Sequence, residues 1–576
     1  MPDPHRTVPD RVRTLPGWLR LAPAFTIALL IVPVAAGLVA ALLPAFGYFP
    51  PLGGMGPSLD PLRDVLSAPG IGRSIFLAAM VGLVSSAIAL GLTFILLACV
   101  WDTPCLSAVR RLVAPLLSVP HAAAAVGLAF LIAPSGFLFR LISPGLTGWD
   151  RPPDLLIVND EWGLAMIAGL VAKEMPFLLL MALAALPALD GSRRRMVMAS
   201  LGYGRGTGFF VAVAPQLYRL IRLPVFAVIA YASSVADVAI VLGPTTPAPL
   251  PVRILEWSSD PDLSTRFMAA AAALVQIVVT LSVLGLWMLG ERVAGWLWLK
   301  VTTSGLRSGG GPPMRAAGIV LGLAPMLAIA LGILLLILWS VAGPWRFPDS
   351  FPASLSLRSW MQMGSDAMEL TITSLIVAIV PTLVAGVLII ACLEVEQRTG
   401  RTGGSRSLLV LYLPLLVPQV TFLFGLQFLS IVGRTDGMIM SVMMAHLVFI
   451  LPYMFLSLAD PYRRFDKRML QVAAGLGMGF WRQLFQIRLP MMVGPILTAL
   501  AIGIAVSIGQ YLPTLLIGAG RVPTLTTEAV ALSAGGDRRA LAVAATLQAL
   551  LPFVAFWIAL AVPSFLARHR RGMQIR

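Results

Sequence analysis

Charged residues are rare in this chain, and two of them are neighbours inside a long apolar stretch. Lys173 and Glu174 lie within residues 162–187. If that stretch crosses a membrane, charges at its middle are costly and usually functional. Adjacent residues on a helix point about 100° apart, so these two need not pair with each other. They are either bonded to neighbouring helices or one of them lines a path through the membrane.

Three further polar residues raise the same question. Asp237 in "SSVADVAIVLG" and Gln510 in "VSIGQYLPTLLIG" occupy similar places in two similar apolar segments. Each could line a path or form a hydrogen bond between helices. His446 lies in another apolar run, where a lone histidine is either a packed hydrogen-bonding group or a proton-relay residue.

Catalytic, metal and nucleotide chemistry find little support in the sequence. The three cysteines form no CxxC pair and the four histidines are scattered, so no metal site is expected. No H-E-x-x-H or G-x-S-x-G motif occurs. The lysines Lys173, Lys300 and Lys467 follow Ala, Leu and Asp, so none completes a phosphate-binding G-x-x-x-x-G-K-[ST] loop. We therefore expect no enzyme activity and no cofactor bound by this chain.

The composition is that of a membrane protein. The chain is 58% hydrophobic and 12% charged, with a mean hydropathy of +0.89, whereas soluble proteins are about 25% charged. The net charge of +16 comes without a basic helix or basic-aromatic interleaving, so nucleic acid is not an expected partner. Apolar runs predict twelve spans. They lie near 21–45, 75–99, 113–133, 162–187, 224–243, 267–290, 316–343, 370–393, 407–433, 437–459, 494–517 and 540–566.

The distribution of charge predicts the orientation. With twelve spans, the two termini and five of the connecting segments lie on one side, and these segments carry most of the Lys and Arg residues. Acidic residues are more frequent in the other six connections. Cytoplasmic segments of membrane proteins are enriched in Lys and Arg. Both termini are therefore expected in the cytoplasm.

An internal repeat divides the chain. Pro176 in "KEMPFLLL" matches Pro452 in "FILPYMFL", and "VPHAAAAVGLAFL" matches "VPQVTFLFGLQFL". The offset falls from 298 to 276 between these matches, which places about 22 extra residues of the first copy between its third and fourth spans. Six spans per copy make the repeat parallel. We predict an all-α polytopic protein of two six-helix halves, residues 1–310 and 311–576, with cores near 70–295 and 365–568 and a linker at 302–313.

The clearest repeated feature is a loop between spans four and five and again between spans ten and eleven. "QVAAGLGMGFWRQLFQIRLP" occupies 471–490, and "MVMASLGYGRGTGFFVAVAP" occupies 196–215. Gly202 and Gly477 suit a turn between two short helices because glycine tolerates positive φ. After Gly477, Phe480, Trp481, Leu484 and Phe485 predict one apolar stripe. A single stripe of this kind could dip into lipid headgroups, but two matching copies favour a shared docking function.

The loop resembles the signature of permease subunits in ATP-binding-cassette (ABC) importers, which reads E-A-A, three residues, Gly, nine residues, I-x-L-P. Residues 471–473, Gly477 and 487–490 keep this spacing; the first copy keeps the spacing but fewer of the residues, and both copies lack the glutamate. Nearly the whole chain resembles two fused permeases of the iron(III), thiamine and sulfate type. The docking residues implied are Ala199, Gly202, Phe209, Phe210, Pro215, Ala473, Gly477, Trp481, Leu484, Phe485, Ile487, Leu489 and Pro490.

The resemblance implies a multi-pass protein of the bacterial inner membrane. Its expected partners are two cytoplasmic ATPase subunits that bind ATP and an extracytoplasmic solute-binding protein. The substrate implied is thiamine, ferric iron or a small anion, and Lys173, Glu174, Asp237 and Gln510 would be the candidate path residues. A proton-coupled secondary transporter with six plus six spans is the alternative, and a membrane-embedded enzyme is a third class.

Overall fold

The computed structural model describes residues 15–50, 53–101, 103–305, 307, 311–400 and 405–566. Within these ranges the regular secondary structure is helical, and the extended pairing consists of two isolated bridges, Phe49 with Gly54 and Ala342 with Leu355. Ten helices are long and apolar enough to cross a membrane, or up to twelve if each of two bent helix pairs counts as one span. The prediction of an all-α polytopic membrane protein with about twelve spans is confirmed.

The first part of the chain forms the helices up to the linker. They are η2 (Gly17–Leu21), α1 (Ala22–Ala45), α2 (Asp60–Ser67), α3 (Ile71–Val100), α4 (Cys105–Leu117), α5 (His121–Ile132), α6 (Phe137–Ile142), α7 (Leu164–Ala185), η4 (Leu186–Leu189), α8 (Gly191–Ser200), α9 (Arg205–Ala212), α10 (Ala214–Ser234), α11 (Asp237–Leu242), α12 (Leu250–Ser259) and α13 (Thr265–Thr303). The predicted linker lies partly outside the described residues.

The second part repeats this order. It consists of α14 (Pro312–Ser340), α15 (Arg358–Gln362), α16 (Gly364–Thr399), α17 (Ser405–Leu416), α18 (Gln419–Val432), α19 (Ile439–Arg463), α20 (Lys467–Gly475), α21 (Phe480–Gln483), the π-helical turn η5 (Leu484–Arg488), α22 (Leu489–Met491), α23 (Val493–Ile508), α24 (Leu512–Gly518), α25 (Leu525–Ser533) and α26 (Arg538–Leu566). From α10 to α12 and from α23 to α25 the helices follow one another in the same pattern. The exact boundary at residue 310 stays a prediction.

Four of the predicted continuous spans are interrupted. The predicted span 113–133 divides into α4 and α5, and 407–433 divides into α17 and α18, which are bent by 85°. In both cases a proline, Pro120 or Pro418, is the residue before the second helix. Proline has no N–H to donate and disfavours helical backbone before it, so a helix stops there. The spans 224–243 and 494–517 also break, between α10 and α11 and between α23 and α24.

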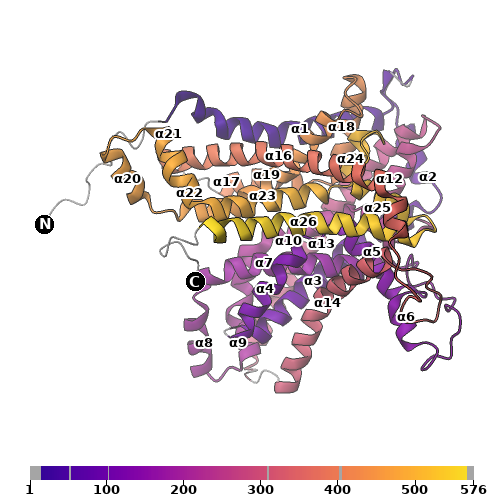
Figure 1. Cartoon of the computed structure of the whole chain (residues 1–576), viewed down its shortest axis with the longest axis horizontal. Coiled ribbons are helices and arrows are strands. Elements are labelled where there is room, and N and C mark those ends of the chain that lie inside the picture. The colour runs from indigo at the N-terminus through magenta and orange to yellow at the C-terminus, as the bar shows by residue number, and fades with distance from the viewer. Residues whose placement is uncertain are drawn as a thin grey trace.

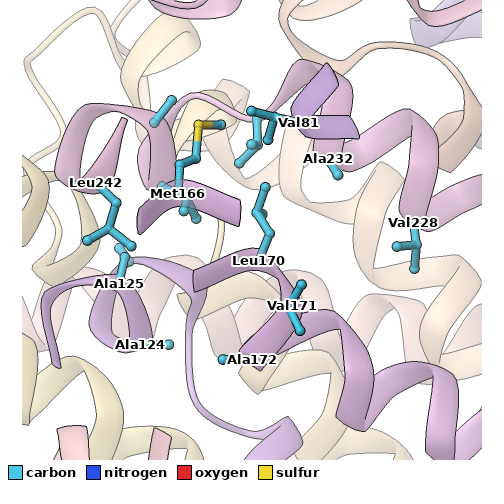
Figure 2. Packing of buried hydrophobic residues seen from close by; sticks show 14 of the residues in the cluster. Val81, Ala124, Ala125, Met166, Leu170, Val171, Ala172, Val228, Ala232 and Leu242 are labelled. Carbon is cyan, nitrogen blue, oxygen red and sulfur yellow. The ribbon is translucent and has the colours of Figure 1, made fainter. Parts of the chain in front are cut away.

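Small residues let the helices of the first half approach closely. Figure 2 shows Val81, Leu170 and Ala232 near one another where α3, α7 and α10 converge, and Leu242 of α11 beside Ala125 of α5; each of these side chains is buried. A Cβ added at Gly82 would lie 2.7 Å from the Ser233 side chain. Helices in lipid associate through such close packing, because lipid tails are as apolar as the side chains.

The two halves are joined by two matched helix crossings. α1 packs on α18 of the other half, where a Cβ at Gly37 would lie 2.1 Å from the Phe422 carbonyl oxygen and a Cβ at Gly425 would lie 1.7 Å from the Gly37 carbonyl oxygen. α14 packs on α5 in the same manner, where a Cβ added at Gly332 or Gly127 would lie 2.9 Å from the carbonyl carbon of the other glycine. The first long helix of each half therefore packs against a helix of the other half.

The Gly37 crossing gives a direct test of this packing. Gly37→Leu is expected to destabilise the protein by about 1–3 kcal/mol, because the added side chain has to displace backbone on α18. Gly91→Leu is the matched control, since Gly91 is also helical but a Cβ there meets nothing within 4 Å. Thermal unfolding of both purified variants measures the difference. Equal midpoints would show that the crossing is not tight.

The molecule has two distinct ends. α8 and α9 lie at one end together with α20 and α21, whereas α2, α6 and α12 lie at the opposite end (Figure 1). The long connection between α5 and α7 also belongs to the latter end, and it holds the residues that the first half has in excess. Arg140 on α6 donates to the Arg346 and Asp349 carbonyl oxygens at 2.8 and 3.0 Å, which ties this insertion to the second half.

Candidate functional site

The two repeated loops, called here the first loop (196–215) and the second loop (471–490), have the same backbone turn. Gly202 has φ of +80° and Gly477 has φ of +81°. In the second loop the amides of Gly477 and Met478 donate to the carbonyls of Ala474 and Ala473, each at 3.0 Å. The first loop repeats both bonds 275 residues earlier. This is the Schellman helix end, which requires a residue with positive φ.

The predicted apolar stripe of the second loop is divided between two environments. Phe480 and Leu484 are buried against Leu19 and Val395. Trp481 and Phe485 are exposed and stack on each other, with ring centroids 5.9 Å apart. Phe480 and Leu484 therefore face inward, because η2 covers that side of α21. Trp481 and Phe485 face outward, so the four residues do not form one exposed face.

Exposed apolar residues recur in both loops on either side of the turn: Phe210 and Phe485 match after it, and two further pairs match before it. Val197 and Leu201 are each 52% exposed in the first loop, and their matches Val472 and Leu476 are 64% and 79% exposed in the second. All four lie at or next to the C-terminal ends of α8 and α20. They form a pair of equivalent apolar surfaces at one end of the molecule.

The remaining predicted loop residues have varied surroundings. Ala199, Phe210 and Pro490 are exposed, Phe209 and Ala473 are buried, and Pro215, Ile487 and Leu489 are half-buried. Pro215 and Pro490 each lie in the first turn of a helix, α10 and α22. In the second loop the chain then bends by 77° into α23.

A buried ion cluster anchors the second loop to α16. The Glu394 carboxylate accepts from Arg488 at 2.5 Å, from Arg398 at 2.9 Å and from the Tyr462 hydroxyl at 2.6 Å. The side chains of Arg488 and Glu394 are each 1% exposed. A buried pair of this kind resists the removal of either partner, because the remaining charge would be left uncompensated.

The first loop is anchored differently. Val213, which is fully buried, stands at the position that matches Arg488. The buried ring of Phe209 packs edge-on against Trp101 and Phe94, with centroids 5.8 and 6.3 Å away. The first loop is thus held by aromatic packing and the second by charge.

A second site, called here the polar chamber, is the group of polar and aromatic side chains gathered where the helix breaks of the two halves meet. His121 Nε2 lies 3.1 Å from Glu174 Oε1, and the His121 ring packs on Tyr231 at 4.9 Å between centroids. Asp237, at the start of α11, interacts electrostatically with His121 and Glu174. Tyr511 of the second half lies within electrostatic range of Asp237, and Tyr453 within that of Glu174.

The chamber includes only part of the predicted path set. Glu174 and Asp237 come together, and Gln510 lies in the break beside Tyr511. Lys173 lies beside Glu174 and interacts electrostatically with it, while its ammonium donates to the carbonyls of Leu116 and Leu117 at 3.4 and 3.0 Å, at the end of α4. Sequence reasoning missed His121 and the three tyrosines. The position of His121 directly after the repeated Val-Pro pair is the signal that could have found it.

His446 forms a separate network in the second half. Its Nδ1 lies 2.7 Å from the Ser507 hydroxyl and its Nε2 lies 2.9 Å from the Thr514 hydroxyl. The Thr514 hydroxyl itself donates to the Gln510 carbonyl at 2.8 Å. Both ring nitrogens are engaged in bonds that join α19 to α23 and α24. This arrangement supports the packed hydrogen-bonding interpretation of His446 rather than the proton relay.

No metal centre accompanies these sites within the described part of the chain, where no three His, Cys, Asp or Glu residues are grouped as metal ligands would be.

Comparison with known proteins identifies the family for most of the chain. It is 31% identical over 461 residues to the inner membrane ABC transporter permease protein YnjC of Escherichia coli strain K12, covering 80% of this chain and 82% of YnjC. It is 26% identical over 240 residues to PhnV of Salmonella typhimurium strain LT2, named provisionally as a 2-aminoethylphosphonate transport system permease, covering 41% of this chain and 88% of PhnV. No family model and no solved structure matches.

The length relations agree with two permease cores in one chain. PhnV is matched over most of its length by less than half of the present chain. YnjC is matched over most of the length of both proteins. With ten to twelve membrane-crossing helices, this chain is a multi-pass inner-membrane protein, and it belongs to the family of ABC transporter permeases.

Proposed function

We propose that this chain is the permease subunit of an ABC importer and that the first and second loops are its two ATPase docking sites. The observation that carries the proposal is the repeated Schellman turn, with an exposed Val-Leu pair before it in each loop. Two equivalent apolar surfaces at the same end of a protein with an internal repeat could each bind one copy of the same partner. The end with both loops is then cytoplasmic, as are both termini.

The sequence indicates which subunits bind ATP and which subunit crosses the membrane. The chain has no phosphate-binding loop, so ATP is bound and hydrolysed on separate subunits, one for each loop, and this chain binds no cofactor of its own. An extracytoplasmic solute-binding protein would deliver the substrate to the opposite end, where α2, α6 and α12 lie (Figure 1). The permease then alternates between outward and inward access.

The polar chamber supports a cationic substrate. It brings the carboxylates of Glu174 and Asp237 together with tyrosine rings, and the Lys173 ammonium is engaged by two backbone carbonyls of α4. Carboxylates and aromatic faces both attract cations. Among thiamine, ferric iron and small anions, this favours thiamine or ferric iron over an anion.

Reconstitution in vesicles tests the importer. Uptake should require the ATPase subunits, ATP and the binding protein, and a pH gradient alone should drive none. Uptake driven by a pH gradient without an ATPase would instead establish the proton-coupled secondary transporter. The ligand carried by the co-purified binding protein identifies the substrate.

Neutralising the chamber carboxylates tests the path. Asp237→Asn and Glu174→Gln should each lower uptake of a cationic substrate about ten- to a hundredfold, because a bond to a charged group contributes about 1.5–3 kcal/mol. Glu369→Gln, at an exposed residue of α16 outside the chamber, is the control. Initial uptake rates at equal amounts of inserted protein provide the measurement. Unchanged rates in both chamber variants would remove these residues from the path.

A further inference from the structure

A cavity of about 610 Å³ lies beside the first loop, between α8, α9 and the start of α14. Three arginines line it: Arg195 on α8, Arg205 at the start of α9 and Arg315 on α14. None of its lining residues, all in the described part of the chain, is acidic. The cavity therefore combines a strongly positive wall with enough volume for a small anionic group.

The backbone around the cavity adds to this positive potential. Gly204 and Arg205, which begin α9, both line it, and no side chain caps this helix start. Amides at the start of a helix attract anions. Arg315 is fixed in place, because its Nε donates to the Cys99 carbonyl at 2.9 Å.

The repeat shows that two of these arginines are not needed to build the loop. At the offset of 275 that relates the loops, Arg195 corresponds to Leu470 and Arg205 to Phe480. Leu470 and Phe480 are buried apolar residues, 4% and 8% exposed. The same backbone turn thus forms in the second loop with apolar side chains at both positions, so the turn itself does not require the two arginines.

Neighbouring aromatic residues indicate the depth of the cavity in the membrane. Trp101, at the end of α3, lines it. Trp298 on α13 is exposed and its indole donates to the Phe210 carbonyl of α9 at 3.3 Å. Lys300 lies over the exposed ring of Trp296 at 3.7 Å. Tryptophan gathers at the headgroup level of membranes, so α9 lies where phospholipid phosphates are found.

We propose that this cavity binds a phosphate-type anion, the headgroup of an anionic phospholipid, held by Arg195, Arg205 and Arg315. Basic pockets between helices on the cytoplasmic side are suited to such headgroups. The bound lipid bridges the first loop and α14, and it steadies the first loop in a way that has no match in the second. Lipid binding itself does not depend on the proposed function; only its effect on coupling does.

The test measures lipid retention by the full-length protein. Wild type and the double variant Arg195→Leu/Arg205→Phe, which copies the second loop, are purified from bilayers containing phosphatidylglycerol, and bound lipid is counted by native mass spectrometry. Two basic residues at a membrane surface correspond to about a thirtyfold loss of affinity. Arg193→Leu, an exposed residue of α8 that does not line the cavity, should retain lipid as wild type does.

Further variants and measurements distinguish a lipid headgroup from a soluble anion as the ligand. Arg315→Met removes the third arginine from a different helix and should also weaken retention, which guards against misfolding of the double variant. Equal retention by wild type and all variants would overturn the proposal. So would saturable binding of inorganic phosphate without lipid retention, which would assign the cavity to a soluble anion. Altered ATPase stimulation of the variants in pure phosphatidylcholine would instead assign the arginines to the ATPase and contradict the lipid site.

Discussion

Arg488→Ala should lower the free energy of unfolding by about 3 kcal/mol and weaken coupling through the second loop. The change leaves the Glu394 carboxylate buried with one guanidinium, that of Arg398, and one hydroxyl in place of three donors. Removing one partner of a buried ion pair costs about 3–5 kcal/mol. The remaining bonds to Glu394 place the expected effect at the lower end. Thermal or denaturant unfolding of the purified protein measures it.

A double variant distinguishes pairing from packing. Glu394→Gln combined with Arg488→Met should be less destabilised than the sum of the two single changes, because the Glu394–Arg488 pair is then removed as a unit and only the ion pair of Glu394 with Arg398 is lost besides it. Val213→Ala at the matching position of the first loop is the control, with an expected cost of about 1–2 kcal/mol from two lost methyl groups. Additive effects of the two single changes would show that Glu394 and Arg488 do not act as a pair.

Much of the architecture could be predicted from the sequence. Apolar run length identified the segments that cross the membrane, because a span of about 20 residues leaves a strong signal. The glycine turns were predicted at both loops, where Gly202 and Gly477 do adopt positive φ. The interruptions within four spans were not predicted, although Pro120 and Pro418 mark two of them. Hydrophobicity does not change across such a break, so run length cannot detect it.

The side-chain partners were beyond the reach of sequence reasoning. Glu394 and Arg488 are 94 residues apart, and no local pattern connects them. The position of Lys173 within its span indicated function, but its bond to the Leu117 carbonyl depends on where α4 ends. The apolar stripe after Gly477 was visible, but its division into buried and exposed halves depends on η2, which packs on it from the start of the chain.

The two loops are alike in backbone and different in attachment. The second is joined to α16 by charges and the first to α3 by aromatic rings. An ion cluster holds fixed directions, whereas packed rings permit small displacements. On this basis we expect the second loop to transmit ATPase motion more rigidly, in agreement with its closer match to the family signature.

Gly477→Val should abolish uptake and leave membrane insertion intact. A Cβ at Gly477 meets no atom of the described residues within 4 Å, so the substitution creates no clash within that part of the chain. The effect comes from φ of +81°, which is costly for a β-branched residue. The turn would open, and Leu476 would no longer be presented in the same direction. Uptake by vesicles, normalised to inserted protein, measures the result.

Two companion variants identify the cause. Gly477→Asn should retain most of the uptake, because asparagine tolerates the left-handed region better than other residues with a side chain. Gly479→Val should also retain uptake, since Gly479 has φ of −71° in extended backbone and its Cβ would likewise meet nothing. If Gly477→Asn fails as completely as Gly477→Val, then bulk against the ATPase is responsible rather than backbone strain. If all three variants transport normally, the second loop is not a docking site, because a changed turn would then have no effect on coupling.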